Sequence, residues 1–152
     1  MRRKMILDII EKKPGVGFNE IARQTKLSNG VVSHYIFQLL KDEEIVKSGI
    51  RAKYFVQKIS EKERELILIL SNPTNLKIIK VLLENGTLKS KNITKMIEKS
   101  VSTVSISLKN MEKAKVISRK IMNEESKLTS DIGYNISNVK FVKELISKYD
   151  FN

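Results

Sequence analysis

The stretch NEIARQTKLSNGVVSHYIFQLLKDEEIV, residues 19–46, decides the fold of this chain. Its apolar residues recur at steps of three and four, the spacing of one buried side of a helix. They are Ile21, Ala22 and Leu27 in the first part, and Val32, Ile36, Leu39 and Leu40 in the second. Polar Ser28 and Asn29 lie between the two parts. A side-chain oxygen there accepts hydrogen bonds from the free N–H groups of a helix's first turn. The stretch therefore predicts a short helix, a tight turn and a longer helix.

The same pattern occurs a second time, 72 residues further along the chain. Sliding the sequence by that distance without a gap matches Ile6 with Ile78, Ile10 with Leu82, Ile21 with Ile93, Ser28 with Ser100, Val32 with Val104, Ser33 with Ser105, and Leu39 with Met111. The matched positions are those of the buried helix sides and the cap, which is what two copies of one fold need. Because the period has the size of a domain, we expect two helix-turn-helix domains in tandem.

Composition favours a polyanionic partner. The chain has 152 residues, a net charge of +12 and a pI near 9.8. Residues 1–72 carry 14 basic and 9 acidic side chains, and residues 73–152 carry 15 and 8, so both repeats are basic. Neutralising phosphates releases counterions from nucleic acid, and a basic protein gains affinity in this way. A lysine-rich chain is also basic for compositional reasons alone, so charge by itself does not decide between the two.

Several classes of function are excluded or disfavoured by residue types. The chain has no cysteine and one histidine, so we expect no metal and no other cofactor. No apolar run approaches the ~20 residues needed to cross a bilayer, and the basic N-terminus lacks a cleavage site, so we expect a cytoplasmic protein without a membrane partner. No phosphate-binding loop or nucleophile–base pair has a recognisable spacing, and we expect no enzyme.

A β-hairpin, or wing, is expected after each helix pair. The expected strands are 45–47 and 54–56 around a turn at 48–52, and 116–122 and 134–136 around a longer tip at 123–133. Basic side chains on a wing favour the phosphate backbone or the minor groove. The first wing is basic, whereas the second tip holds Glu124, Glu125 and Asp131 besides Lys127.

Further helices and their caps follow from polar residues before apolar runs. A first helix is expected over 5–13. Ser60 with Glu63 is expected to cap a helix through the run 66–70, and Thr74 or Asn75 the next helix, which ends at Asn85–Gly86. Ser90 is expected to cap a helix over 92–99, and Ser100 or Ser102 a helix that ends at Lys113.

Two helices have apolar surfaces with more than one interpretation. The run 66–70 is apolar on all sides, so it packs between the two domains or against a second chain. The closing helix over 139–149 has a stripe that covers its own domain or forms a dimer seam; the stripe consists of Val139, Val142, Leu145, Ile146 and Tyr149. Either helix is therefore a candidate seam for a homodimer.

With these residues in view, the chain resembles winged-helix transcriptional regulators of the ArsR/MarR-like superfamily. NPTNLKII at residues 72–79 is similar to the "(D/N)-P-T-R-L-x-I-L" opening of ArsR-like repressors, and TVSISL at residues 103–108 to their "T-V-S-x-H-L" signature, with Ser107 at the usual histidine. PGVGFNEIA at residues 14–22 and LSNGVVS at residues 27–33 look like segments of archaeal regulators with two such domains. The resemblance implies DNA binding. Metal-sensing relatives use cysteine or histidine clusters, and metal sensing is therefore not carried over.

The helix-turn-helix arrangement places the leading half of each second helix, about 29–43 and 102–113, in the major groove of double-stranded DNA. The expected contacts are Ser28, Asn29, Gly30, Ser33, His34 and Gln38 in the first repeat, and Ser102, Thr103, Ser105 and Lys109 in the second. Backbone or minor-groove contacts are expected from Lys47, Arg51, Lys53, Arg119, Lys120 and Lys127. Each residue has a competing explanation without DNA: the serines cap helices, and the lysines are exposed to solvent. Phe37 and Ile106 are apolar where relatives often have polar residues, and neither predicted helix carries a base-reading arginine.

The sequence thus predicts a mainly α chain with small β wings, an α+β fold. The expected organisation is a first winged domain at 1–59, a linker helix at 60–72, a second winged domain at 73–138 and a C-terminal helix at 139–152 for packing or dimerisation. A DNA-binding transcription regulator is the favoured function. The alternatives are a winged-helix module that binds proteins of the transcription machinery, favoured by the acidic second wing, and an architectural DNA-binding protein with low specificity, favoured by the lysine excess.

Overall fold

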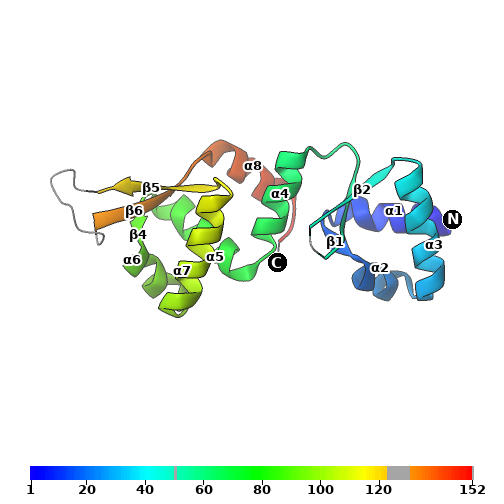
Figure 1. Cartoon of the computed structure of the whole chain (residues 1–152), viewed down its shortest axis with the longest axis horizontal. Helices are drawn as coiled ribbons and strands as arrows, with labels where there is room; N and C mark the ends of the chain where they lie inside the picture. The colour runs from blue at the N-terminus through cyan, green and yellow to red at the C-terminus, as the bar shows by residue number, and fades with distance from the viewer. Residues whose placement is uncertain (50, 123–130, 152) are drawn as a thin grey trace. The chain divides into compact units, whose positions relative to one another are not determined.

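The computed structural model describes residues 1–49, 51–122 and 131–151 (Figure 1). The chain divides into two compact units, Met1–Leu68 and Ile69–Asn152. Each unit is mainly helical and contains one three-stranded antiparallel sheet. The prediction of an α+β chain with two winged helix-turn-helix folds is therefore confirmed.

The first unit places three helices before a hairpin. Its elements are α1 (Arg2–Lys12), β1 (Val16–Gly17), α2 (Phe18–Thr25), α3 (Asn29–Lys41), β2 (Ile45–Ser48), β3 (Lys53–Val56) and the start of α4 (Glu61–Leu70). The strand order is β1-β3-β2, so β3 lies between the other two. Helix α1 contacts α2, α3 and β3. The core side chains that are fully buried in this unit include Ile6, Ile10, Ile21, Leu39 and Phe55.

Strand β1 is a short element that the sequence pattern did not predict. Gly15 precedes it with a φ of +87°, a conformation that side chains other than glycine rarely adopt. A Cβ on Gly15 would lie 3.5 Å from Cζ of Phe55 and 3.5 Å from Cγ2 of Ile67. The chain therefore turns tightly over the buried aromatic ring, and Val16 then pairs with Tyr54. The first helix also begins earlier than expected, at Arg2.

Helix α4 begins at the expected cap. The backbone N–H of Glu63 donates to Oγ of Ser60 at 3.2 Å. Leu66, Ile67 and Leu70 are at most 3% exposed, so the apolar run is largely buried within the single chain. Whether this helix also forms a seam with a second chain stays a prediction.

The second unit repeats the order of the first. Its elements are α5 (Pro73–Asn85), β4 (Leu88–Lys89), α6 (Ser90–Ile97), α7 (Val101–Lys113), β5 (Ile117–Ile121), β6 (Ile132–Ile136) and α8 (Val139–Lys148). The strand order is β4-β6-β5. Helix α5 contacts both α6 and α7, and these two helices contact each other. The buried core includes Ile78, Ile79, Ile93, Val104 and Met111.

The internal repeat extends to the backbone conformation. Lys26 and Glu98, which are 72 residues apart, both end a short helix in the left-handed region, with φ of 59° and 56°. Glu43 and Lys115 match in the same way, with φ of 58° and 63°. Left-handed backbone is costly for residues other than glycine. Its recurrence at matched positions shows that both turns are built alike.

Two expected caps are corrected in the second unit, and a third is decided between its two alternatives. Asn72, not Thr74 or Asn75, caps α5: its Oδ1 accepts from the N–H groups of both residues, at 2.9 and 3.1 Å. Pro73 then occupies the first helical position, where its missing N–H costs nothing. Ser90 is the first residue of α6, and Lys89 stands at the cap position. Ser100 caps α7, so Ser102 lies inside that helix.

Helix α8 places part of its apolar stripe in the core. Val142 and Leu145 are at most 3% exposed, whereas Val139 is 45% exposed. Ile146 and Tyr149 are half-buried. The helix therefore covers its own unit with the middle of the stripe, and its role as a dimer seam stays a prediction.

Within the described ranges, no single helix is long and apolar enough to cross a membrane. Helices α4 and α5 meet that test of length and composition only as a pair bent by 100°. A core helix meets the same test, and α5 supplies five buried residues to its unit.

Candidate nucleic-acid interface

Helix α3 presents a polar outer side at its leading end. Ser28 caps it, since the N–H of Val31 donates to Oγ of Ser28 at 3.3 Å. The inner side is buried through Val32, Ile36 and Leu39. The opposite, outer side consists of exposed Gly30, Ser33, His34 and Phe37, and Asn29 is exposed as the first residue of the helix. The structure therefore brings the expected polar residues of the first repeat together on one exposed side.

His34 and Gln38 lie on adjacent turns of α3. Nε2 of Gln38 is 3.1 Å from Nε2 of His34, and the His34 ring meets the Tyr35 ring edge-on at a centroid distance of 5.1 Å. Gln38 is half-buried. These contacts hold the imidazole in one orientation on the outer side.

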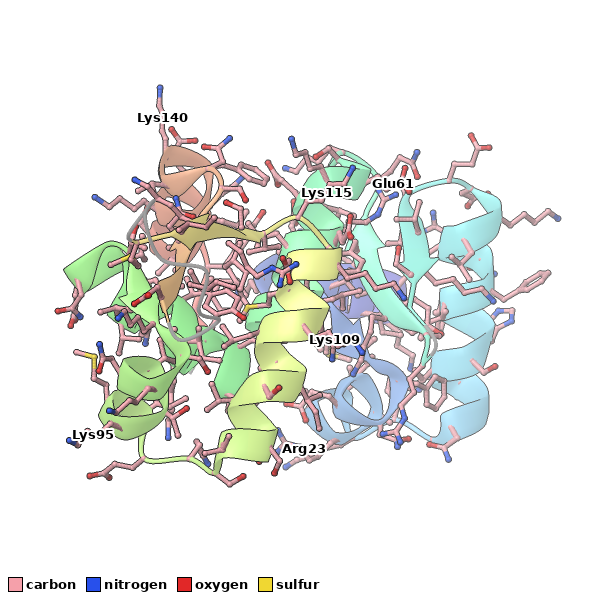
Figure 2. All side chains as sticks on the ribbon, turned by 60° about the vertical axis from the view of Figure 1, so that its left-hand side comes forward. Arg23, Glu61, Lys95, Lys109, Lys115 and Lys140 are labelled. Atoms are coloured by element: carbon pink, nitrogen blue, oxygen red, sulfur yellow. The ribbon has the colours of Figure 1, made fainter. Side chains whose placement is uncertain are left out.

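Helix α7 has the same construction. The N–H of Thr103 donates to Oγ of Ser100 at 3.2 Å, and that hydroxyl donates to Oγ1 of Thr103 at 2.7 Å. The outer side of α7 consists of exposed Ser102, Ser105, Ile106 and Lys109, with Thr103 beside them, and Val101 is exposed as the first residue of the helix. Ser107, at the position where relatives usually have histidine, is 7% exposed and belongs to the inner side. Figure 2 shows Lys109 on α7, Lys95 on the preceding helix α6 and Lys115 just beyond α7.

The two outer sides correspond position by position but differ in chemistry. Asn29 and His34 of α3 match Val101 and Ile106 of α7, while Phe37 matches Lys109. The exposed fractions are 66% for Phe37, 62% for Ile106 and 72% for Val101. Sequence reasoning singled out Phe37 and Ile106 but did not notice Val101. Its three-residue spacing from Val104 continues the buried series, so the helical period alone places it on the inner side, yet as the first residue of α7 it is exposed.

The first wing offers two exposed cations and one that is partly covered. Lys47 and Arg51 are exposed. Lys53 is half-buried, and its Nζ would lie 3.4 Å from a Cβ placed on Gly17. The Lys53 ammonium group therefore lies over β1 in this structure.

In the described part of the second wing, the cations lie on β5. Lys120 is exposed, whereas Nε of Arg119 donates to Oε2 of Glu112 at 2.6 Å. Lys127, with Glu124 and Glu125, lies outside the described residues. Nζ of Lys89 lies 3.3 Å from Oδ1 of Asp131.

A surface hollow of about 640 Å³ opens beside β5 and the start of α6. Its lining residues are Lys89, Ser90, Lys91, Asn92, Arg119, Ile132 and Tyr134. Three of these seven side chains are cationic. Lys89 and Arg119 already pair with Asp131 and Glu112, so a phosphate in the hollow would exchange with those carboxylates.

Charge differs between the two helix-turn-helix segments. Residues 90–115 contain six lysines and two glutamates, a net charge of +4. Residues 18–43 contain three basic and three acidic side chains, a net charge of zero. The second segment therefore attracts a polyanion more strongly.

An ion-paired cluster covers the outer face of α2. Oε1 of Glu20 accepts from Nη2 of Arg23 at 2.6 Å, and its Oε2 accepts from Nε of Arg23 at 2.9 Å. Nε2 of Gln24 donates to Oε1 of Glu20 at 2.9 Å, and Nζ of Lys13 is 3.5 Å away. The hydrogen bonds from Arg23 and then Gln24 lower the pKa of Glu20 to about 2 from its ordinary 4.5.

This cluster predicts a pH-dependent stability difference for Glu20→Gln. The folded-state pKa lies below the unfolded one, so the ionised carboxylate stabilises the fold above about pH 4.5 and less as the pH falls towards 2. We expect the variant to unfold at a slightly lower urea concentration than the parent chain at pH 7, with the difference shrinking over that window. A urea titration followed by circular dichroism at several pH values measures this. A difference independent of pH would contradict the assignment.

Comparisons with known families agree with the fold in both units. A family model described as an N-terminal HTH domain matches residues 1–67. A second model, described as the bacterial regulatory protein of the arsR family, matches residues 72–119. No curated protein matched the chain. Helix-turn-helix domains of these kinds indicate a DNA-binding regulator, and such families are typically not enzymes. The chain therefore has two winged helix-turn-helix domains in tandem, of the kind that indicates a DNA-binding regulator, and its second domain is similar to the arsR family model.

Proposed function

We propose that the chain regulates transcription by placing α3 and α7 in the major groove of double-stranded DNA. The observation that carries this proposal is the pair of matched, exposed outer sides on two capped helices. A recognition helix presents an exposed, polar leading end to the base edges. Asn29, Ser33 and His34 would contact bases from α3. Ser102, Thr103, Ser105 and Lys109 would do so from α7.

Gly30 supports this assignment. It lies in the first turn of α3, as the second residue of the helix. A Cβ on Gly30 would meet no atom within 4 Å. Folding therefore does not require glycine at this position, whereas a close approach of a phosphate to the backbone would use it. Ser28 and Ser100 serve first as caps, and the same oxygens lie at the ends that would face DNA.

The basic side chains would act on the phosphate backbone. Those of the first wing are Lys47, Arg51 and Lys53, and those of the second are Arg119, Lys120 and Lys127. Lys53 would first leave β1, and Arg119 would exchange Glu112 for a phosphate. Charge-assisted contacts of this kind set the position of a protein on DNA without reading sequence. The hollow beside Arg119 offers room for one such phosphate.

The proposal keeps a division into winged domains at 1–59 and 73–138, a linker helix at 60–72 and a C-terminal helix at 139–152. A homodimer would use either of the last two segments. Two other functions remain to be tested against the regulator. The exposed ring of Phe37 favours a protein-interaction module. The lack of arginine on either outer side favours an architectural DNA-binding protein.

Selection from random double-stranded DNA, repeated at several salt concentrations and followed by sequencing, tests the proposal. We expect an enriched motif, palindromic if the chain acts as a dimer. We also expect affinity to fall steeply with salt, by about 10³-fold or more between 50 and 200 mM if roughly six or more phosphates are neutralised. Strong salt-dependent binding without a motif would establish the architectural function. Absence of binding at low salt would contradict both DNA functions and leave the interaction module.

A further inference from the structure

The outer side of α7 carries a large apolar side chain that the fold does not use. Ile106 is 62% exposed. The inner side of the same helix is formed by Val104, Leu108 and Met111, which are buried. At the matched position of α3 the chain has His34 instead, and α3 has the same length, a serine cap at the matched position and three buried apolar residues at matched positions. An isoleucine is therefore not needed at this position for the helix to fold or pack.

The surroundings of Ile106 are polar on every neighbouring turn. Residues three and four positions away are its neighbours on a helix surface. Those residues are Ser102, Thr103, Lys109 and Asn110, and all of them are exposed. One apolar side chain ringed by hydroxyl groups, an amide and a lysine is too small an apolar surface for a protein interface, which needs a contiguous patch of several hundred Å².

The same arrangement matches the edge of an A·T base pair in the major groove. Thymine presents its C5-methyl group beside the O4 acceptor, and adenine adds an acceptor and a donor. The hydroxyl groups and the lysine can donate to those acceptors, while the isoleucine covers the methyl group. The net charge of +4 on residues 90–115 draws a polyanion to this side.

We propose that Ile106 determines specificity by contacting the C5-methyl group of thymine, so that the second domain selects thymine at a defined position of its site. This inference rests on the proposed function, since it requires α7 to enter the major groove. It also implies that the two domains read different chemistry. Helix α3, with Asn29 and His34, would read hydrogen-bonding edges, and α7 would read a methyl group.

The test uses the full chain and the tightest-binding duplex from selection. Each thymine is replaced in turn by deoxyuridine, which lacks only the methyl group. We expect one or two positions at which the replacement raises Kd about fourfold, the factor that corresponds to roughly 0.8 kcal/mol for one buried methyl-sized group. At those positions 5-bromodeoxyuridine, whose bromine fills the space of the methyl group, is expected to restore the affinity.

Ile106→Ser supplies the decisive comparison. Serine and isoleucine have similar helix propensities, so the exposed substitution leaves α7 intact. We expect this variant to bind the thymine and uracil duplexes equally. Val139→Ser, which also removes an exposed apolar side chain in the same unit, is expected to keep the parent's preference for thymine. Thermal unfolding by circular dichroism confirms that both variants are folded.

The remaining outcomes overturn the inference. A parent chain that binds its site equally with thymine and uracil, or an enriched site without thymine, removes Ile106 as a methyl reader while the proposed function stands. If replacing thymine by uracil weakens binding equally for the parent and for Ile106→Ser, another residue makes the methyl contact. A change of oligomeric state in the variant, without a change in DNA binding, assigns Ile106 to a protein partner. Failure of the parent to bind any duplex overturns the proposed function itself.

Discussion

Replacing Ser105 by glutamate is expected to lower the affinity for duplex DNA about thirtyfold or more. Ser105 is exposed on the outer side of α7, between residues that would face base edges. A carboxylate there would be brought against the phosphates and the electronegative major groove, and like charges at an interface cost roughly 2 kcal/mol or more. Fluorescence anisotropy with a labelled duplex at fixed salt measures the change.

The matched control for this variant is Ser147→Glu on α8. Ser147 is also an exposed helical serine of the second unit, so the substitution changes the net charge equally and leaves the outer side of α7 untouched. We expect its affinity to fall only by the small factor that one added charge causes. Equal losses in both variants would show that net charge, and not a contact at α7, controls binding.

The same substitution at Ser33 compares the two domains. Ser33 occupies the matched position on α3, but residues 18–43 carry no net charge. We therefore expect Ser33→Glu to reduce affinity less than Ser105→Glu. A larger loss at Ser33 would indicate that the first domain supplies most of the binding free energy.

The second large effect is expected on stability, from Phe55→Ala. Phe55 is 0% exposed and lies on β3, the central strand of its sheet. Removing a buried phenylalanine loses its transfer free energy and leaves a cavity, at a cost of about 3–5 kcal/mol. Urea unfolding measures the change. Hydrogen exchange is expected to show lost amide protection in the β1-β3-β2 sheet.

Phe37→Ala is the control, because its ring belongs to the same unit and is 66% exposed. We expect its free energy of unfolding to stay within about 0.5 kcal/mol of the parent. An equal loss of stability in both variants would contradict the packing described for Phe55 and the adjoining Gly15 turn. A cost of less than about 1 kcal/mol for Phe55→Ala would contradict it as well.

Much of the fold was predictable because one sequence pattern occurs twice in the chain, so the positions that both copies share stand out. Buried helical positions must be apolar in both copies, and Val32 and Val104 are each 0% exposed. The caps Ser28 and Ser100 also recur, since each satisfies an otherwise free N–H group. The wings followed from strand-forming residues after each longer helix.

The two-residue strands β1 and β4 were missed for a physical reason. Each contributes only two paired positions, Val16 and Gly17 in one sheet and Leu88 and Lys89 in the other. Two residues show no alternation, so pairing with a distant strand decides their conformation. The distant partner is visible only in the folded chain.

Cap assignments failed where several polar residues were adjacent. Asn72, Thr74 and Asn75 are all capping residues by type. Asn72 is the cap because Pro73 favours the first helical position, and the cap is the residue before that position. Asn75 instead donates to the carbonyl oxygen of Ile69 at 3.0 Å.

The candidate interface was only partly visible in the sequence. Polar residues off the buried stripe, such as Ser33 and Ser105, were found because the helical period places them away from the core. Val101 was missed because an apolar residue at a helix start suggests packing. The pairing of Arg119 with Glu112 was missed as well, since it joins a strand to the preceding helix across a turn.

The central claim, that the outer sides of α3 and α7 bind duplex DNA, is tested most directly by mapping the contact surface in solution. The measurement is a titration of the isotopically labelled chain with a selected duplex, followed by amide chemical shifts. The account predicts that the largest shifts fall on residues 28–38 and 100–110, with smaller ones on the wings. Shifts concentrated on α8 or α4, with α3 and α7 unchanged, would contradict it.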